Sequence, residues 1–493
     1  MNPVEPALSP DACYLALKAK DARFDGSFFT GVTSTGIYCR PVCRVRTPRR
    51  ENCRFFALAA QAEGAGFRPC LRCRPELAPQ ALRWSLQDAS AVLAQQAARL
   101  LDEPEAWGGD APSVELLAQR LGISDRHLRR IFEAQLGVSP LQYLQTRRLL
   151  SAKQLLADTA LPITQIALVS GFGSIRRFNA AFTAHYGLSP GALRREGTQR
   201  DAFALVRLGY RPPYDVDAML GFFRTRAIEG LEAVTDRTLS RTLALDAHGR
   251  RWEGWLSMAF DEAHCQVLLR VSESLHGVLP LVIRRVRAAL DLDADPHAIN
   301  ARLHGSFPLG DGLRVPGALG GYELAVRAVL GQQITVAAAR TLAQRLVHRF
   351  GTPIATPDPA LRHLFPAPEV LAAAHGDALG TLGIVRQRQG AIVAIARAVA
   401  EGGLTLHPGA DVPATTAALK ELPGIGDWTA QYIAMRALRW PDAFPAGDVA
   451  LHKALGVQQS KQPAREAEAA SQAWKPWRSY AVVRAWSALS QGA

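Results

Sequence analysis

The sequence lacks any apolar run long enough to cross a membrane, and it has few charged residues, 20% of the chain against 48% hydrophobic residues. The first absence argues against a membrane-spanning protein, and the apolar content argues against a disordered one. The opening stretch MNPVEPALSPDA has no basic segment of the kind that begins a signal peptide, so we expect no secretory leader. With 493 residues the chain is too long for one hydrophobic core, and we expect three or four domains.

Acidic residues and cysteines are also scarce. Lys and Arg number 57 against 44 Asp and Glu, which gives a net charge of +13. This balance favours a polyanionic partner, with nucleic acid ahead of an acidic membrane surface. Seven cysteines in so long a chain point to a reducing compartment. Clustered cysteines there bind metal or carry out chemistry rather than form disulfides.

Four of the cysteines form two short clips. Cys39 and Cys43 lie in GIYCRPVCR, and Cys70 and Cys73 lie about thirty residues later in PCLRCRP. Two clips of soft ligands are the usual format of a tetrahedral Zn²⁺ site. A structural zinc is the simpler interpretation. Four sulfur ligands leave no open position for water, so any chemistry at the site must use a coordinated sulfur as the nucleophile. Surrounding arginines are expected to favour the thiolate form. The other cysteines lack a partner clip and are interpreted as ordinary thiols: Cys13, Cys53 and Cys265.

An internal repeat follows the cysteine clips. IFEAQLGVSP at 131–140 recurs as AFTAHYGLSP at 181–190, and each copy ends an amphipathic helix. A preceding helix, a glycine turn and a serine cap complete each unit, with Gly122 and Ser124 in the first copy and Gly171, Gly173 and Ser174 in the second. The pattern predicts two helix-turn-helix units whose second helices enter the major groove; the alternative is a helical-hairpin repeat with solvated basic faces. The candidate DNA-binding residues are Arg126, His127, Arg129 and Arg130 in the first copy and Arg176, Arg177 and Asn179 in the second.

The last 290 residues or so have a different pattern of apolar and polar residues. Residues 203–290 mix β-type runs with one amphipathic segment and predict a small α+β subdomain, whereas the pattern from about 296 onward is helical. Within the helical part, LPGIGDWTAQYIAMRAL at 422–438 places Gly424 and Gly426 in a turn directly before a helix. Backbone N–H groups of such a helix-hairpin-helix turn bind a DNA phosphate without reading sequence.

Three side chains near this hairpin have a simple structural explanation as well as a functional one. Trp428 and Tyr432 lie on one helix face, and core packing explains that spacing by itself. Asp448, in FPAGDVALHKAL, follows a loop and precedes an amphipathic helix, so it is expected to be an N-cap whatever else it does.

The first two hundred residues resemble two known families. Residues 10–78, with DARFDGSFFTGVTSTGIYCRPVC, RRENCRFF and AGFRPCLRCRPE, resemble the N-terminal domain of the Ada-type adaptive-response proteins, and the repeat resembles the AraC-type DNA-binding domain. The first resemblance implies that Cys39 irreversibly takes a methyl group from a methylated DNA phosphate. Zinc with four thiolates carries a charge of about −2, and methylation removes one negative charge. Nearby arginines are then freer to bind phosphates: Arg40, Arg44, Arg46, Arg49, Arg50 and Arg54.

Residues 203–490 resemble the helix-hairpin-helix DNA glycosylases of the 3-methyladenine DNA glycosylase II type. The hairpin, the aspartate about twenty residues later, VRAVLGQQITVAAA and WKPWRSYAVVRAW carry this resemblance. It implies that Asp448 is the catalytic carboxylate and that Trp428, Tyr432 and Trp486 line the pocket for a flipped alkylated base. Gln333 is a further candidate DNA-binding residue, and it stands where the best-known member has a leucine wedge. Trp428 stands where lyase-type relatives have a Schiff-base lysine, so a monofunctional glycosylase is expected.

These patterns and resemblances predict a multidomain, mainly α protein with α+β parts. The expected domains are a small zinc domain (1–82), a double helix-turn-helix (83–200), a small α+β subdomain (201–295) and an all-helical helix-hairpin-helix glycosylase domain (296–493).

The expected function is a methylation-activated transcription regulator that also excises alkylated bases such as 3-methyladenine, with Zn²⁺ as its cofactor. Expected partners are double-stranded DNA, at alkylated and promoter sites, and RNA polymerase, with no membrane; the expected location is the bacterial cytoplasm, at the nucleoid. One alternative is a regulator whose glycosylase-like half only binds DNA. The other is a repair enzyme whose N-terminal half only tethers it.

Overall fold

The chain folds into two compact units. The computed structural model describes residues 8–80, 89–103, 107, 112–196 and 204–491. The first unit comprises residues 1–212, 260–283 and 292–295, and the second comprises 213–259, 284–291 and 296–493. The bounds of the four predicted domains stay predictions, because these domains are defined by function and the two units by compactness.

A small four-stranded sheet opens the first unit, with strand order β3-β1-β2-β4. β1 pairs antiparallel with both β2 and β3, and β2 pairs in parallel with β4, where Tyr38 lies opposite Pro69. Because β2 ends at Cys39 and Cys70 directly follows β4, this pairing brings the two cysteine clips together. The elements are α1 (Pro10–Ala19), β1 (Phe29–Val32), β2 (Ile37–Cys39), β3 (Cys53–Phe56), α2 (Ala59–Gly64) and β4 (Arg68–Pro69).

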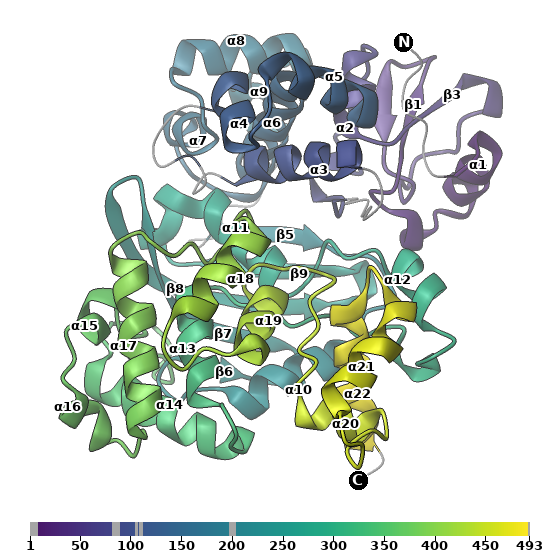
Figure 1. Cartoon of the computed structure of the whole chain (residues 1–493). Helices are drawn as coiled ribbons and strands as arrows, with labels where there is room; N and C mark the ends of the chain where they lie inside the picture. Colours follow the sequence, from purple (N-terminus) through teal and green to yellow (C-terminus); the bar gives the residue numbers. More distant parts are fainter. Residues whose placement is uncertain (1–7, 81–88, 104–106, 108–111, 197–203, 492–493) are drawn as a thin grey trace. The chain divides into compact units, whose positions relative to one another are not determined.

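The repeat folds into helices whose ends are set by the repeated residues (Figure 1). Gly137 and Gly187 end α5 and α8, each with a left-handed φ of 69° that a side chain would strain. A Ser-Pro pair follows each glycine, and the serine hydroxyl accepts a backbone N–H at the start of the next helix. The helices are α3 (Ala89–Asp102), α4 (Val114–Arg120), α5 (Asp125–Leu136), α6 (Pro140–Asp158), α7 (Ile163–Val169), α8 (Ile175–Tyr186) and α9 (Pro190–Glu196).

Both predicted serine caps of the helix-turn-helix units are confirmed, and so are the predicted glycine turns except at Gly173. Ser124 and Ser174 cap α5 and α8 by accepting backbone N–H groups at 3.3 and 3.2 Å. Gly122 and Gly171 have left-handed φ values of 67° and 84°, as the tight turns require. Gly173 does not have a left-handed φ, so Gly171 makes the second turn.

The predicted α+β region contains two groups of antiparallel strands. β5 pairs with β9 over its whole length, from Ala204 opposite Val271 to Gly209 opposite Gln266. β6, β7 and β8 form a meander in which β7 pairs with both neighbours. The elements are β5 (Ala204–Gly209), α10 (Val216–Arg226), β6 (Glu232–Val234), β7 (Thr238–Ala247), β8 (Arg250–Asp261), β9 (Gln266–Val271) and α11 (Leu279–Ala289).

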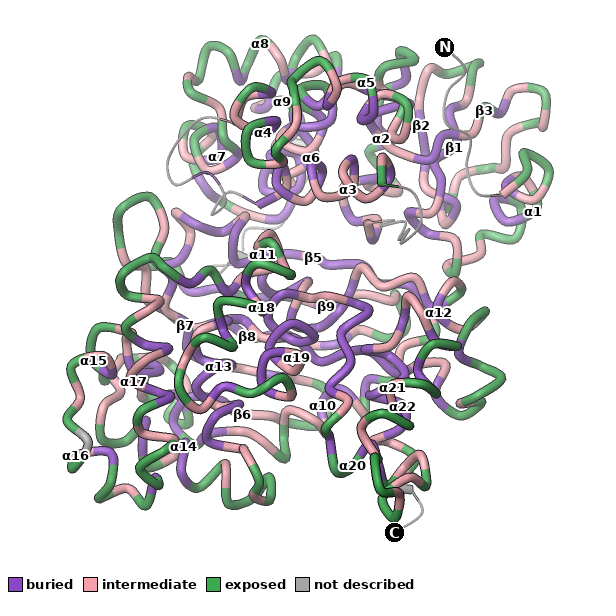
Figure 2. The backbone as a smooth tube through the Cα atoms, in the orientation of Figure 1, coloured by how far each residue is buried: buried purple, intermediate pink, exposed green. Residues whose placement is uncertain are grey.

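The rest of the second unit is helical, as predicted, and α13 lies at its centre. α13 packs against α14, α17 and α19, and Figure 2 shows it buried along most of its length. The hairpin consists of α18, the turn at 422–426 and α19. The helices are α12 (Pro296–Leu303), α13 (Gly321–Leu330), α14 (Val336–Phe350), α15 (Pro368–Ala372), α16 (Gly376–Gly380), α17 (Arg386–Ala400), α18 (Val412–Glu421), α19 (Asp427–Arg436), α20 (Val449–Ala454), α21 (Pro463–Ser471) and α22 (Arg478–Gln491).

The predicted fold class, a mainly α multidomain chain with α+β parts, is confirmed. Among the described residues, no helix has both the length and the apolar composition needed to cross a membrane.

Candidate functional sites

The four clip cysteines converge into one cluster. Their Sγ atoms all lie within 4.8 Å of one another, close to the edge of about 3.8 Å that a tetrahedral zinc with 2.3 Å bonds to sulfur requires. Cys39, Cys43 and Cys70 are buried and Cys73 is partly exposed. Four soft sulfur donors this close together fit Zn²⁺. Exposure does not single out Cys39 among the four, so its role still depends on the resemblance.

Within the cluster the sulfurs shift one another's pKa in opposite directions: the pKa values of Cys39 and Cys73 are raised, and those of Cys43 and Cys70 are lowered. A hydrogen bond from the Cys39 thiol is the largest cause that lowers the pKa of Cys43 to about 7, and it also lowers that of Cys70 strongly.

Arg40 is not one of the phosphate-binding arginines, contrary to the prediction. Its side chain is 12% exposed, and its guanidinium pairs with Asp25 and donates to the Cys73 carbonyl at 2.9 Å. Its backbone N–H also donates to Cys73 Sγ at 3.3 Å. Arg40 therefore holds the two clips together. The arginines of the predicted set that are exposed are Arg44, Arg46, Arg49 and Arg54.

The zinc-cluster strands and the helix-turn-helix helices of the first unit share buried charges that the sequence did not reveal. Glu63, on α2, accepts the Tyr38 hydroxyl at 2.8 Å, pairs with His185 of α8 at 2.9 Å and accepts the Thr146 hydroxyl of α6. Glu76 pairs with Lys153 of α6. Since Tyr38 directly precedes Cys39, Glu63 connects the strand that carries this cysteine to α6 and to α8, one of the two predicted reading helices.

The two predicted reading helices present their basic residues differently. In α8, the candidates Arg176, Arg177 and Asn179 are all exposed, as Figure 2 shows for the outer face of this helix. In α5, Arg129 donates to Glu115 of α4 at 3.4 Å, and Arg130 lies 3.0 Å from the His127 ring. Arg126 is exposed. All seven candidates lie on the two second helices of the repeat.

Asp448 caps α20 and also forms the centre of an aromatic site. Its Oδ1 accepts the Leu451 N–H at 2.7 Å, the predicted cap bond. Oδ1 also accepts the Trp486 indole N–H at 3.1 Å, and Oδ2 accepts the Trp428 indole N–H at 2.9 Å. The residue is 9% exposed. Three donors from α19, α20 and α22 thus fix one carboxylate, so the cap explanation is correct but incomplete.

The three predicted aromatic residues gather beside this carboxylate. The Trp428 and Tyr432 rings stack with centroids 5.2 Å apart and planes 15° apart, and the Trp486 ring lies 6.4 Å from Tyr432. All three residues are partly exposed rather than buried. Simple core packing, the alternative for this spacing, would have buried them.

Two arginines and a phenylalanine that the sequence reasoning missed complete the surroundings of Tyr432. Arg436, one helical turn further along α19, donates to the Tyr432 hydroxyl at 2.5 Å and lies 4.6 Å from the Phe222 ring. Burial alone raises the pKa of Tyr432, but the charges of Arg436 and Arg226 outweigh it and lower that pKa below its ordinary value. The i,i+4 spacing of Tyr432 and Arg436 was the one available signal.

The hairpin turn and the loop before α14 are the two remaining predicted DNA contacts. Gly424 has a left-handed φ of 76°. Gly426 is the N-cap of α19 and has no side chain, so no cap side chain accepts the first backbone N–H groups of this helix. Gln333 is exposed and also left-handed, with φ of 54°.

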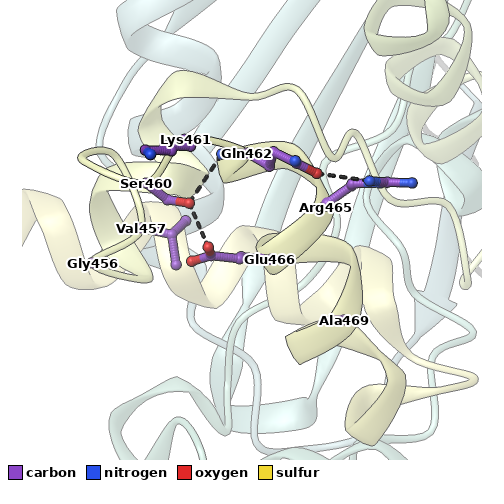
Figure 3. A pocket seen from close by; sticks show the side chains of 8 residues that line it. All are labelled: Gly456, Val457, Ser460, Lys461, Gln462, Arg465, Glu466 and Ala469. Carbon is purple, nitrogen blue, oxygen red and sulfur yellow. Dashed lines mark hydrogen bonds between the residues drawn. The ribbon is translucent and has the colours of Figure 1, made fainter.

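A separate open cavity of about 700 Å³ lies in the second unit (Figure 3). Residues between Gly456 and Ala469 line it, and Arg465 donates to Gln462 at its rim. None of the predicted site residues lines this cavity.

Four family models match consecutive stretches of the chain. They are the metal binding domain of Ada over residues 12–76, a helix-turn-helix domain over 117–196, the AlkA N-terminal domain over 205–320 and the HhH-GPD superfamily base excision DNA repair protein over 326–479. Together with the cysteine cluster and the hairpin, they define a DNA-binding protein that joins a zinc-dependent regulator to a base excision repair enzyme.

A protein of Mycobacterium tuberculosis named probable bifunctional transcriptional activator/DNA repair enzyme AlkA is 38% identical over 97% of this chain and 96% of its own length. The chain belongs to this family of bifunctional transcriptional activators and DNA repair enzymes. DNA-3-methyladenine glycosylase 2 of Escherichia coli is 34% identical over 57% of this chain and 96% of its own length. The Escherichia coli bifunctional transcriptional activator/DNA repair enzyme Ada is 37% identical over 34% of this chain and 43% of its own length.

Proposed function

We propose that this chain detects methylated DNA phosphates through Cys39 and excises alkylated bases such as 3-methyladenine through Asp448. The observation that carries the second role is a carboxylate that accepts two indole N–H groups beside three partly exposed aromatic rings. We assign methyl detection to residues 1–82 and promoter binding by the double helix-turn-helix to 83–200. We assign base excision to the α+β subdomain (201–295) together with the helix-hairpin-helix domain (296–493).

Base excision needs a group that stabilises positive charge on the sugar. When the N-glycosidic bond breaks, its electron pair leaves with the base and an oxocarbenium-like cation develops, as in glycoside hydrolysis. A preorganised charge facing that cation contributes on the order of 10²–10³ in rate. Asp448 supplies it, because three fixed donors prevent its carboxylate from reorienting. Water then adds to the sugar carbon and loses a proton, which leaves a free base and an abasic site.

The aromatic residues fit a flipped, alkylated base. Extrusion costs a few kcal/mol, and stacking in the pocket offsets part of that cost. The faces of Trp428 and Trp486 attract a cationic N-alkyl purine by roughly 0.5–2 kcal/mol. Tyr432 has positive neighbours in Arg436 and Arg226, so we expect it to orient the base by stacking rather than by attracting its charge. Trp428 offers no amine for a Schiff base, so no strand cleavage is expected.

Methyl detection is a direct transfer to sulfur. Cys39, Cys43, Cys70 and Cys73 would hold the zinc, and its charge would keep their sulfurs deprotonated at neutral pH. Cys39 Sγ attacks the methyl carbon of a methylphosphotriester, the methyl–oxygen bond breaks and the DNA regains a phosphodiester with its negative charge. The cluster loses one negative charge beside the exposed arginines, and promoter binding by the helix-turn-helix pair tightens. Recruitment of RNA polymerase and a location at the nucleoid of the bacterial cytoplasm belong to this proposal.

The test of the repair role is base release by the purified chain. Double-stranded DNA treated with a methylating agent is incubated with the protein, and freed bases are separated by chromatography. We expect 3-methyladenine in the soluble fraction and intact strands until alkali is added. Binding of the DNA without base release would instead identify the regulator whose glycosylase-like half has no catalytic activity.

A further inference from the structure

Gln332, which precedes Gln333, connects two turns that lie far apart in the sequence. Its Nε2 donates to the Gly424 carbonyl at 3.0 Å and to the Thr429 hydroxyl at 2.9 Å. Gly424 is in the hairpin turn and Thr429 is in the first turn of α19. Both N–H groups of one amide therefore join the loop before α14 to the hairpin.

The backbone of Gln332 is held from the opposite side. Arg388, on α17, donates to the Gln332 carbonyl. The next residue, Gln333, has a left-handed φ of 54°, which costs about 1–2 kcal/mol in a residue with a Cβ. A strained residue at a loop tip persists only where its surroundings hold it. The bonds on both sides of Gln332 supply that restraint.

The two joined turns are both exposed. Gln333 is exposed, Val336 at the start of α14 is 42% exposed, and Gly426 at the hairpin is exposed. An exposed loop tip that is strained and tied to a second exposed turn has the properties of a preformed contact surface, because ordering it on binding costs little.

We propose that Gln332 is a positioning residue that fixes the spacing between the Gln333 tip and the hairpin turn, so that both contact the same duplex at once. This inference rests on the proposed function and on the DNA contacts predicted from the sequence for Gln333, Gly424 and Gly426. With the amide bridge intact, binding of the hairpin turn to a duplex holds the Gln333 tip at a high effective concentration beside the same duplex. Without the bridge, this advantage would be lost. Binding would then weaken, although the catalytic carboxylate is untouched.

The test replaces Gln332 by methionine, which has a similar length and no N–H donors. Loss of buried hydrogen bonds of this kind corresponds to about a tenfold rise in Kd. We expect this rise for a duplex that contains one abasic site, measured by fluorescence anisotropy. The single-turnover rate of base release at saturating protein should stay within about threefold of the parent, because Asp448 and its indole partners are unchanged. A purely structural role would lower the melting temperature without this split between affinity and rate.

Gln389→Met is the matched control. The Gln389 amide also donates to a backbone carbonyl, that of Ile384 at 2.6 Å, on the same helix as Arg388. It makes no bond to the hairpin among the described residues, so its Kd should stay at the parental value. An equal rise in Kd for both variants, or an unchanged Kd for folded Gln332→Met, would overturn the inference.

A second pair of variants decides the matter if Gln332→Met does not fold. Thr429→Val removes one acceptor of the bridge, whereas Thr429→Ser keeps it; we expect weaker DNA binding only for valine. Equal affinities for the two would count against the bridge. Because affinity is measured separately from base release, a parent that binds DNA but frees no base would refute the proposed excision and leave the bridge to be judged on Kd.

Discussion

Replacing Asp448 by asparagine separates its two roles. As an N-cap alone, Asp448→Asn would be nearly silent, because asparagine caps a helix about as well as aspartate. The observed geometry predicts more. An amide has one acceptor oxygen, whereas the carboxylate receives three donors through two oxygens. If the asparagine oxygen faces Leu451 and Trp486, its NH₂ group points at the Trp428 indole N–H.

The expected cost in stability follows from that donor facing another donor. One lost hydrogen bond in a nearly buried site costs about 1–3 kcal/mol in the free energy of unfolding. Each kcal/mol lowers the melting temperature of a unit of this size by about 2–4 °C. Trp428→Phe removes the opposing donor, so Asp448→Asn should destabilise that background less than it destabilises the parent.

The expected cost in rate is larger and of different origin. The substitution removes the negative charge that faces the sugar cation, so release of 3-methyladenine should slow by on the order of 10²–10³. Single-turnover release from methylated duplex DNA at saturating protein measures this, with melting temperature and DNA affinity recorded in parallel. Trp428→Phe should not restore the rate when combined with Asp448→Asn.

Asp411→Asn is the matched control, because Asp411 caps α18 through one bond to the Ala414 N–H at 2.8 Å and is exposed. It should leave both stability and base release near the parent. Base release within tenfold of the parent by folded Asp448→Asn would refute the catalytic assignment and leave only the cap.

Three further predictions concern the first unit. Mass spectrometry after exposure to methylphosphotriester DNA should place one methyl on Cys39, and a methyl on another clip cysteine would contradict the assignment. Chelation of zinc should unfold the small domain, because structural zinc contributes about 10–16 kcal/mol of folding free energy. Arg177→Ala should weaken promoter binding and reduce the salt slope by about one if the side chain contacts a phosphate, and unchanged affinity at low salt would contradict its role. Burial raises the pKa of Glu76, but the charges of Lys153 and Arg74 outweigh it and hold that pKa below its ordinary value of 4.5. The stabilisation is therefore present above about pH 4.5 and lost as pH falls through the folded-state pKa, so Glu76→Gln should flatten the loss of thermal stability in acid; an unchanged acid profile would contradict this.

Features encoded within a few residues were predictable from the sequence. The repeat predicted both helix-turn-helix units because Ser124, Ser174, Gly122 and Gly171 act on the backbone next to them. Each cysteine clip is a short local unit, and the chemistry of sulfur ligands indicated that the two would meet at one zinc. The Asp448 cap is of the same kind, because a cap bond reaches only three residues along the chain.

Features that depend on partners from distant elements were decided only by the tertiary structure. Arg40 looked like a free basic residue until the fold placed Asp25 against it. The resemblance brought Trp428, Trp486 and Asp448 together by role, but only the packing of α19 and α22 shows both indole N–H groups directed at one carboxylate. Nothing in the pair Gln332–Gln333 indicates that one amide bonds a hairpin about ninety residues away. Hydrogen-bond geometry is fixed to within tenths of an ångström, and local sequence patterns cannot position segments separated by a whole domain core to that accuracy.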